Sequence, residues 1–371
     1  PEDDGQLNKP ASGWTAFNDT LAKGLSKGRN GLGVLYVFSG GNGAWEGDYS
    51  SADSATSSRG AISVCATDAA GERAPYSERG SNLTVCAPSG RSTTPASAPE
   101  ITTTSVKDKY TDDFGGTSAS APMVSGVAAL MLQANPRLTW RDVPLILART
   151  ARQVDVSKGG WSELRSPLAG VTGHDVLSYS HHYGFGVVDA EAATRLARSW
   201  QSVGGSSTLR QCGPYSATVN QAIPETTPVS DAVLENPFAD ASGLSKAAVN
   251  GVTSRISAAG CGIQHIEHVE VVLTATDDTG ARAHPSAGDL QITLTSPAGQ
   301  TSTLTTPHLC YNISGQQTSC QGLVDFSFGL SRHLEEPAIS GTSSDWTLAA
   351  ADRRTGNTGR LRNWSITLYG R

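Results

Sequence analysis

A serine within a run of small residues is the strongest candidate for chemistry in this sequence. The segment Gly-Thr-Ser-Ala-Ser-Ala-Pro occupies residues 116–122 and leads directly into an apolar stretch, residues 123–130. A glycine-marked turn there delivers the hydroxyl of Ser118 to the first turn of a buried helix. Backbone N–H groups and the positive end of the helix dipole converge at this point and can stabilise an oxyanion. We therefore predict that Ser118 is a nucleophile; the alternative is a serine that only caps a core helix.

Alternating strand and helix signals surround this motif. Apolar residues recur at helical spacing over residues 14–26, and short apolar runs typical of buried parallel strands follow. The expected strands are 34–38, 61–66 and 83–88, and the expected helices are 118–134 and 139–152. Thr139 and Asp142 are spaced as in a capping box at the start of the last helix. The pattern up to residue 199 predicts an α/β domain with a parallel sheet.

The character of the sequence changes after Trp200. Residues 203–207 read Val-Gly-Gly-Ser-Ser, which resembles a linker, and helical periodicity is scarce beyond them. Alternation of apolar and polar residues appears instead in four segments: 268–275, 290–295, 346–350 and 364–369. This pattern favours an antiparallel sandwich or jelly roll. The predicted domains are residues 1–199 and 200–371.

Composition excludes some classes of function. The 371 residues carry a net charge of −6, which argues against a nucleic acid partner. No apolar run reaches the roughly 18 residues of a membrane span. Charged residues make up only 17% of the chain, which suits a secreted, turn-rich protein.

The cysteines point to an oxidising compartment. None of the 6 has Cys-x-x-Cys spacing, and their even number suggests three disulfides. The simplest pairing joins Cys65 to Cys86, Cys212 to Cys261, and Cys310 to Cys320. Six buried free thiols are the alternative.

The serine motif closely resembles the nucleophile motif of subtilisin-like serine proteases. Residues 1–5 (Pro-Glu-Asp-Asp-Gly), 76–78 (Tyr-Ser-Glu) and 180–190 resemble the kexin/furin-like proprotein convertases in particular. The region from Cys212 to Gly370 is similar to the P domain (Homo B domain) that follows their catalytic domain. The resemblance implies a partial subtilisin-like α/β catalytic domain followed by an all-β jelly-roll P domain.

The order of the catalytic residues then becomes informative. Subtilisin-like enzymes place Asp, then His, then Ser along the chain. All 8 histidines here follow Ser118, at positions 174, 181, 182, 265, 268, 284, 308 and 333. The resemblance implies that the catalytic Asp and His lie in an N-terminal part missing from this sequence, so this fragment alone should be inactive. The rival interpretation is a catalytically dead binding or structural protein.

The resemblance also implies roles for five residues. Asn42, in the turn 39–43, would donate to the oxyanion together with the N–H of Ser118; alone, it would be read as a turn residue. Asp3, Asp48 and Glu78 would bind calcium, which prefers oxygen ligands. Asp3 and Asp53 would bind the Arg or Lys that precedes the cleaved bond. Solvated loop acids are the alternative for all four carboxylates.

The predicted function is that of a serine endopeptidase cleaving after basic residues. Asn8 and Ala55 stand where the convertases often have an acid and an aromatic, so selection further upstream should be looser and a protease of broader specificity is a second rival. The expected partners are polypeptide substrates and a propeptide or chaperone, in the secretory pathway, the cell envelope or outside the cell. In the P domain, Asp352 is a candidate for a second ion site, although we favour a turn there.

Overall fold

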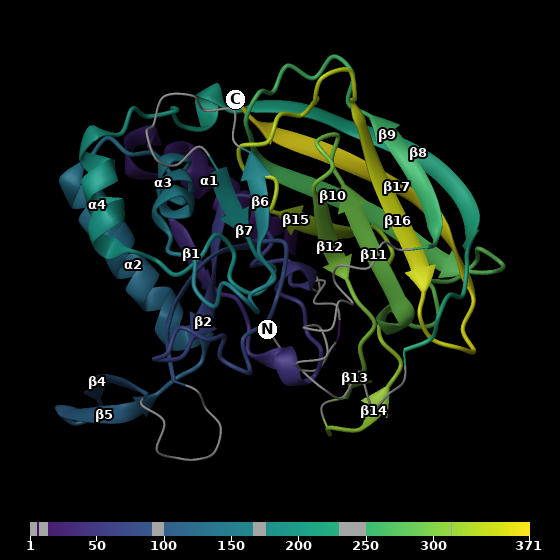
Figure 1. The fold of residues 1–371 in the computed structure, drawn as a ribbon, viewed down its shortest axis with the longest axis horizontal. Helices are drawn as coiled ribbons and strands as arrows, with labels where there is room; N and C mark the ends of the chain where they lie inside the picture. Colours follow the sequence, from purple (N-terminus) through teal and green to yellow (C-terminus); the bar gives the residue numbers. More distant parts are fainter. Residues whose placement is uncertain (1–5, 7–13, 91–99, 166–175, 230–249, 313) are drawn as a thin grey trace. The chain divides into compact units, whose positions relative to one another are not determined.

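The computed structural model describes residues 6, 14–90, 100–165, 176–229, 250–312 and 314–371 (Figure 1). Two compact units are distinguished. The α/β unit comprises Pro10–Asn42 and Ser58–Leu209, and the β unit comprises Pro1–Lys9, Gly43–Ser57 and Arg210–Arg371. Each unit is described by itself below.

A parallel sheet forms the centre of the α/β unit. Strands β1 (Tyr36–Ser39), β2 (Ala61–Thr67) and β3 (Leu83–Pro88) lie in the order β1-β2-β3, and both pairings are parallel. Strands β2 and β3 are buried along almost their whole length, as a continuous apolar run requires. The predicted parallel sheet is therefore confirmed.

The described residues of this unit form four α-helices: α1 (Trp14–Lys27), α2 (Thr117–Ala134), α3 (Asp142–Thr150) and α4 (Ala190–Ser199). Helix α2 packs on all three strands, with Val124, Val127 and Met131 buried against Val64 and Val85 (Figure 1). Helix α3 begins three residues later than expected because Thr139 lies in the preceding turn. Its capping interaction is nevertheless present, since Asp142 Oδ2 accepts from the N–H and the hydroxyl of Thr139 at 2.7 and 2.8 Å.

Two antiparallel hairpins were not predicted. One pairs β4 (Ile101–Ser105) with β5 (Lys109–Phe114), and the other pairs β6 (Ser162–Arg165) with β7 (Val176–Tyr179). The β4–β5 hairpin stands apart from the sheet in Figure 1. The short 3₁₀ turns among the described residues are η1 (Gly28–Gly31), η2 (Gly43–Trp45), η3 (Ser50–Ala52), η4 (Ser206–Thr208) and η6 (Ala287–Asp289).

The part of the β unit that the structure describes contains two four-stranded antiparallel sheets. Their orders are β15-β10-β17-β8 and β12-β11-β16-β9. The strands are β8 (Arg210–Ile223), β9 (Val252–Ser257), β10 (Ile266–Asp277), β11 (Leu290–Thr295), β12 (Thr301–Thr305), β15 (Phe326–Leu330), β16 (Asp345–Asp352) and β17 (Gly359–Gly370), with a small hairpin of β13 (Cys310–Tyr311) and β14 (Gln317–Thr318). The sheets share one core, in which Trp346 and Trp364 are fully buried. The predicted all-β sandwich is confirmed.

All three predicted disulfides are present. Cys65 is bonded to Cys86, Cys212 to Cys261, and Cys310 to Cys320, and no free cysteine remains. The first disulfide joins facing residues of β2 and β3. Among the described residues, no helix is both long enough and apolar enough to cross a bilayer.

The segment after α4 is held tightly by two buried charged side chains. The Asp142 carboxylate accepts from Trp200 Nε1, Ser202 Oγ and Val203 N at 2.9, 2.6 and 2.8 Å. Arg141 Nη1 donates to the carbonyl oxygens of residues 203–205 and to Thr208 Oγ1. Both side chains are almost inaccessible to solvent. The linker-like sequence at 203–207 is therefore fixed within the α/β unit, which extends to Leu209.

Candidate active site

Ser118 occupies the second position of helix α2. Gly116 caps the helix at φ +75°, a left-handed conformation that glycine adopts without strain, and Ser118 is exposed to solvent. Its hydroxyl makes no hydrogen bond to any other described residue. The backbone N–H groups of the first helical turn point in the same direction and carry the positive end of the helix dipole. An accessible hydroxyl thus lies beside the backbone N–H groups of a helix N-terminus.

The turn that carries Ser118 is anchored to the sheet. Ser120 Oγ donates to Ala87 O in β3 at 2.9 Å, and Ser89 Oγ donates to Gly116 O at 2.8 Å. Tyr76 supports Ser89, because its hydroxyl lies 2.9 Å from Ser89 Oγ. Burial raises the pKa of Tyr76, so its hydroxyl stays protonated. These contacts fix where α2 begins.

Asn42 lies beside this turn with its amide orientation set. Its Oδ1 accepts from the N–H of Thr117 at 2.8 Å and from the hydroxyl of Thr117 at 2.9 Å. The same hydroxyl lies 3.3 Å from Gly41 N. Because the oxygen end of the amide is held by two donors, the Nδ2 end is left to donate elsewhere. The structure therefore brings Asn42 and Ser118 to the same helix terminus.

Glu78 supports the loop that carries Asn42. The Glu78 side chain is buried, and its N–H donates to Gly41 O at 3.2 Å. A Cβ atom at position 41 would lie 2.0 Å from Glu78 Oε1, and Gly41 has φ +109°. Only glycine fits at position 41. Because Gly41 has no side chain, the Glu78 carboxylate can lie against the backbone of the loop.

The other two described acidic candidates, Asp48 and Asp53, belong to the β unit. Asp48 is buried, and a Cβ atom at Gly43 would lie 2.0 Å from its Oδ2. Asp53 Oδ1 accepts from the N–H groups of Ala55 and Thr56 at 2.8 and 2.9 Å. Asp53 Oδ2 makes no hydrogen bond within the described part of the chain. One carboxylate oxygen therefore fixes the orientation, and the other can receive a cation.

Residues 43–57, the segment that carries Asp48 and Asp53, pack on the sandwich of the β unit. Tyr49 and Ala52 belong to its core, and Ser51 Oγ donates to Leu304 O of β12 at 3.3 Å. Gly329 of β15 approaches so closely that a Cβ atom there would lie 1.7 Å from Ser57 O. The conformation of the acidic segment therefore depends on strands β12 and β15.

Comparisons with known proteins match two separate regions of the chain. The Subtilase family matches residues 5–186, and the Proprotein convertase P-domain matches residues 266–368. The chain combines a subtilase domain with a proprotein convertase P-domain. The family predicted from the sequence is thereby confirmed, as is its fold class.

A rat relative and two solved structures extend the comparison. Proprotein convertase subtilisin/kexin type 6 of Rattus norvegicus is 33% identical over 379 residues, which cover all of this chain and 35% of the relative. The serine protease of Aeromonas sobria has a TM-score of 0.71 at 21% identity, covering 99% of this chain and 69% of that one. Its complex with the chaperone ORF2 gives 0.71 at 20% identity, covering 98% and 68%. The chain thus spans about a third of the convertase's length.

Within this framework, the subtilase site is only partly described. Asp3 and Asn8 lie outside the described residues, so their predicted roles remain predictions. Thr117 was not singled out in the sequence, although it orients Asn42. Its position immediately before the predicted nucleophile, where a hydroxyl can face the preceding loop, was the available signal.

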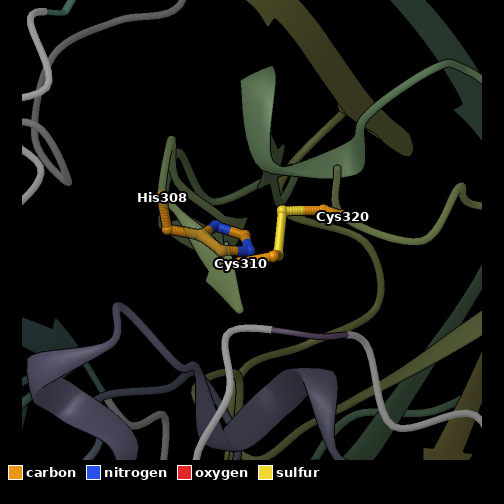
Figure 2. A group of neighbouring side chains, drawn as sticks. All are labelled: His308, Cys310 and Cys320. Carbon is orange, nitrogen blue, oxygen red and sulfur yellow. A yellow bond between two sulfur atoms is a disulfide. The ribbon is translucent and has the colours of Figure 1, made fainter. Parts of the chain in front are cut away.

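One group of residues in the P-domain has the side-chain types of a metal site but cannot bind a metal ion through its cysteines. His308, Cys310 and Cys320 are buried side by side, but the two sulfurs are bonded to each other (Figure 2). His308 Nδ1 lies 2.6 Å from Thr306 O. A disulfide leaves no thiolate to bind an ion, so this group is structural.

Proposed function

We propose that this chain carries the nucleophile, the oxyanion donors and the basic-residue pocket of a serine endopeptidase. The observation that carries the proposal is the exposed Ser118 hydroxyl at the start of α2, beside an Asn42 amide that Thr117 orients. These are the two groups that acyl transfer needs from this side of the site.

The reaction begins when Ser118 Oγ attacks the carbonyl carbon of the peptide. The Ser118 proton passes to a histidine, the C–O bond forms, and the carbonyl oxygen becomes an oxyanion. Asn42 Nδ2 and the N–H of Ser118 stabilise that charge. The C–N bond then breaks as the histidine returns the proton to the leaving amine, and water hydrolyses the acyl-enzyme.

The histidine and aspartate of the triad come from outside these residues. Every histidine of the chain follows Ser118, whereas subtilisin-like enzymes place the base before the nucleophile. Helix α2 carries no charged residue, and Leu130, on the face opposite its core, is 48% exposed.

Specificity for Arg or Lys before the cleaved bond rests on Asp53, together with Asp3. The Asp53 geometry supports this role, because Oδ1 is held by two backbone N–H groups while Oδ2 remains available. A charge-assisted hydrogen bond to a desolvated carboxylate gives strong selection for a cation. Ala55 and Asn8 make a second upstream basic residue less important than in furin-like enzymes.

Calcium is the proposed ligand of Asp48 and Glu78, together with Asp3. The donor set is entirely carboxylate, and two glycines make room for the two described carboxylates, Gly43 for Asp48 and Gly41 for Glu78. When bound, the ion would supply positive charge that stabilises the loops.

The proposed partners are polypeptide substrates and a propeptide or chaperone, encountered in the secretory pathway, the cell envelope or outside the cell. The complex of the Aeromonas sobria protease with its chaperone supports the second of these partners. Three disulfides support an oxidising compartment. A protease of broader specificity and a binding protein without activity remain the rival functions.

Replacing Ser118 in the complete protein tests the proposal. Ser118→Ala should lower kcat by at least about 10⁴-fold with an unchanged fold. Ser125→Ala is the matched control, since Ser125 lies two turns further along α2 and its hydroxyl donates to Ala121 O of the same helix. Substantial hydrolysis by Ser118→Ala would refute the nucleophile. Inactivity of the unsubstituted complete protein toward every peptide tried would favour the binding protein.

A further inference from the structure

The side-chain amide of Gln6 connects the start of the chain to the P-domain. Its Oε1 accepts from Gln321 N at 2.8 Å, and its Nε2 donates to Ser319 O at 3.4 Å. These two backbone groups flank Cys320 within residues 308–321, here called the disulfide loop. Because an amide has one accepting and one donating end, both ends of the Gln6 side chain are engaged at the same stretch of backbone. Gln6 is therefore held at two points by residues 313 and 315 positions away.

Cys320 gives this contact a fixed base. It is buried and bonded to Cys310, and its N–H donates to Ser286 Oγ at 3.4 Å. A Cβ atom at Gly288 would lie 2.2 Å from Cys320 Sγ, so only glycine lets the disulfide lie against this turn. The disulfide therefore fixes the backbone on both sides of Cys320, which is where Gln6 binds.

The disulfide loop also contacts the segment that carries Asp48. A Cβ atom at Gly47, which has φ +84°, would lie 2.6 Å from His308 Cβ, so only glycine permits this approach. His308 lies beside the disulfide (Figure 2), and its N–H donates at 2.9 Å to O of Gly288, the residue against which the disulfide packs. The loop that holds Gln6 thus also contacts the residue directly before a proposed calcium ligand.

Gln6 lies close in the sequence to another proposed ligand. Asp3 precedes it by three residues, and three residues span at most about 11 Å. An anchor at Gln6 therefore limits where the Asp3 carboxylate can lie. A chain end without this anchor samples more conformations, which must be given up when a ligand binds. The contact therefore favours ligand binding without touching the reacting atoms.

We propose that Gln6 is a positioning residue of the protease site and that the disulfide loop is the surface that holds it. This inference rests on the proposed function, in which Asp3 and Asp48 bind calcium and Asp3 with Asp53 binds the basic side chain. The P-domain then contributes to substrate and calcium binding through backbone groups of one loop. Ser118 takes no part in the contact, so KM should change more than kcat.

Kinetics of Gln6→Ala in the complete protein test the proposal. We expect KM for peptides with Arg before the cleaved bond to rise at least about fivefold, while kcat changes by less than about twofold. The Kd for calcium, measured by titration, should rise at least about threefold. Gln317→Ala, at an exposed position of the disulfide loop, is the matched control and should leave all three constants unaltered.

Removing the disulfide supplies a second test. A variant with Cys310→Ser and Cys320→Ser should show the same rise in KM. Adding Gln6→Ala to it should raise KM little further, because both changes remove one contact. A variant with Cys212→Ser and Cys261→Ser is the control, since this disulfide belongs to the same β unit. It should lower Tm without raising KM.

The outcomes separate the positioning role from the proposed function. KM and calcium Kd unchanged in Gln6→Ala would overturn the positioning role and leave the protease activity standing. A rise in KM that Gln317→Ala or the loss of the Cys212–Cys261 disulfide reproduces would also overturn it, because the effect would then be general. An unsubstituted complete protein that neither cleaves after Arg nor binds calcium would overturn the proposed function, and the positioning role with it. Should the variant without the Cys310–Cys320 disulfide fail to fold, Gln6→Ala decides alone.

Discussion

The Asn42 side-chain oxygen accepts from both the N–H and the hydroxyl of Thr117, at 2.8 and 2.9 Å. Thr117 thus holds the oxygen end of the Asn42 amide, which leaves the Nδ2 end to face the proposed substrate site. If Asn42 is the oxyanion donor we propose, Thr117 sets its orientation. The first test follows from this relationship.

Asn42→Leu should lower kcat by about 10²–10³-fold with little change in KM, because the donor acts only on the developing charge. Thr117→Val should lower kcat by about tenfold, since one of the two bonds that orient the amide is lost. Thr117→Ser keeps the hydroxyl and is the control. Equal kcat in Thr117→Val and Thr117→Ser would show that the hydroxyl does not orient Asn42.

Asp53→Asn should reduce the preference for Arg over an uncharged residue before the cleaved bond by at least about tenfold. Asparagine keeps an Oδ1 acceptor for Ala55 N and Thr56 N, so the turn survives while the charge is lost. A peptide-library cleavage profile measures the change. Asp19→Asn, on the exposed surface of α1, should leave the profile unaltered. A preference for Arg that persists in Asp53→Asn would assign selection elsewhere.

Calcium should raise the Tm of the complete protein, because a ligand that binds only the folded state stabilises it by about 2.7 kcal/mol at 100 times Kd. Glu78→Gln should remove most of this shift, as it takes charge from the buried carboxylate beside Gly41. Calorimetry with calcium and then with a chelator gives the comparison. Glu72→Gln, an exposed neighbour in sequence, should retain the full shift.

The stability of the P-domain should fall in acid through Glu336. Burial opposes ionisation of Glu336, but the charge of His333, hydrogen bonds from His333 and Ser296, and the charge of Arg332 together hold its pKa below the ordinary 4.5. A carboxyl with a lowered folded pKa stabilises the protein above its unfolded pKa. That contribution is lost as the pH falls below 4.5 through the folded value.

Glu336→Gln should therefore destabilise the protein by about 3 kcal/mol near pH 7 and flatten the loss of stability below pH 4.5. Urea unfolding at a series of pH values measures both effects. Asp345→Asn, at an exposed position of β16, serves as the comparison. An unchanged acid slope in Glu336→Gln would show that other carboxyls control acid unfolding.

Gly329→Ala should alter substrate binding from within the sandwich. The added methyl group would overlap Ser57 O and displace the segment that carries Asp53. We expect KM for basic peptides to rise severalfold while kcat changes less. Gly262→Ala, whose Cβ would meet only Arg210 Nη1 at 3.8 Å, is the control. An unaltered KM in Gly329→Ala would show that β15 does not control the conformation of the acidic segment.

The regular elements of the chain were largely predictable because their signals are local. Helix α2 and strands β2, β3 and β11 end within one residue of the ranges read from apolar runs. Strands β8 and β12 were missed because small and polar residues dominate them, and β15 because its alternation covers only Phe326–Leu330. Strand β8 pairs with β17 and β15 with β10, both far away in the sequence, so tertiary contacts decide their conformation.

In the candidate site, too, local features could be predicted from the sequence and long-range contacts could not. The motif predicts Ser118 as the nucleophile, and the predicted helix start is confirmed, since α2 begins at Thr117 directly after Gly116. The orientation of Asn42 by Thr117 joins residues 75 positions apart. The packing of Ser51 against Leu304 spans 253 positions. Spacing within a sequence carries no signal for such contacts, since they depend on how the elements pack.

The hydrogen bonds between Asp142 and the segment after α4 determine where the chain can be truncated. Three of the five donors to its carboxylate come from Trp200, Ser202 and Val203. A protein cut after residue 199 would keep a buried charge and lose those donors, at a cost of several kcal/mol. Part of any instability seen after such a cut would come from the α/β unit's own missing residues. Ending the chain after Leu209 isolates the effect of removing the P-domain.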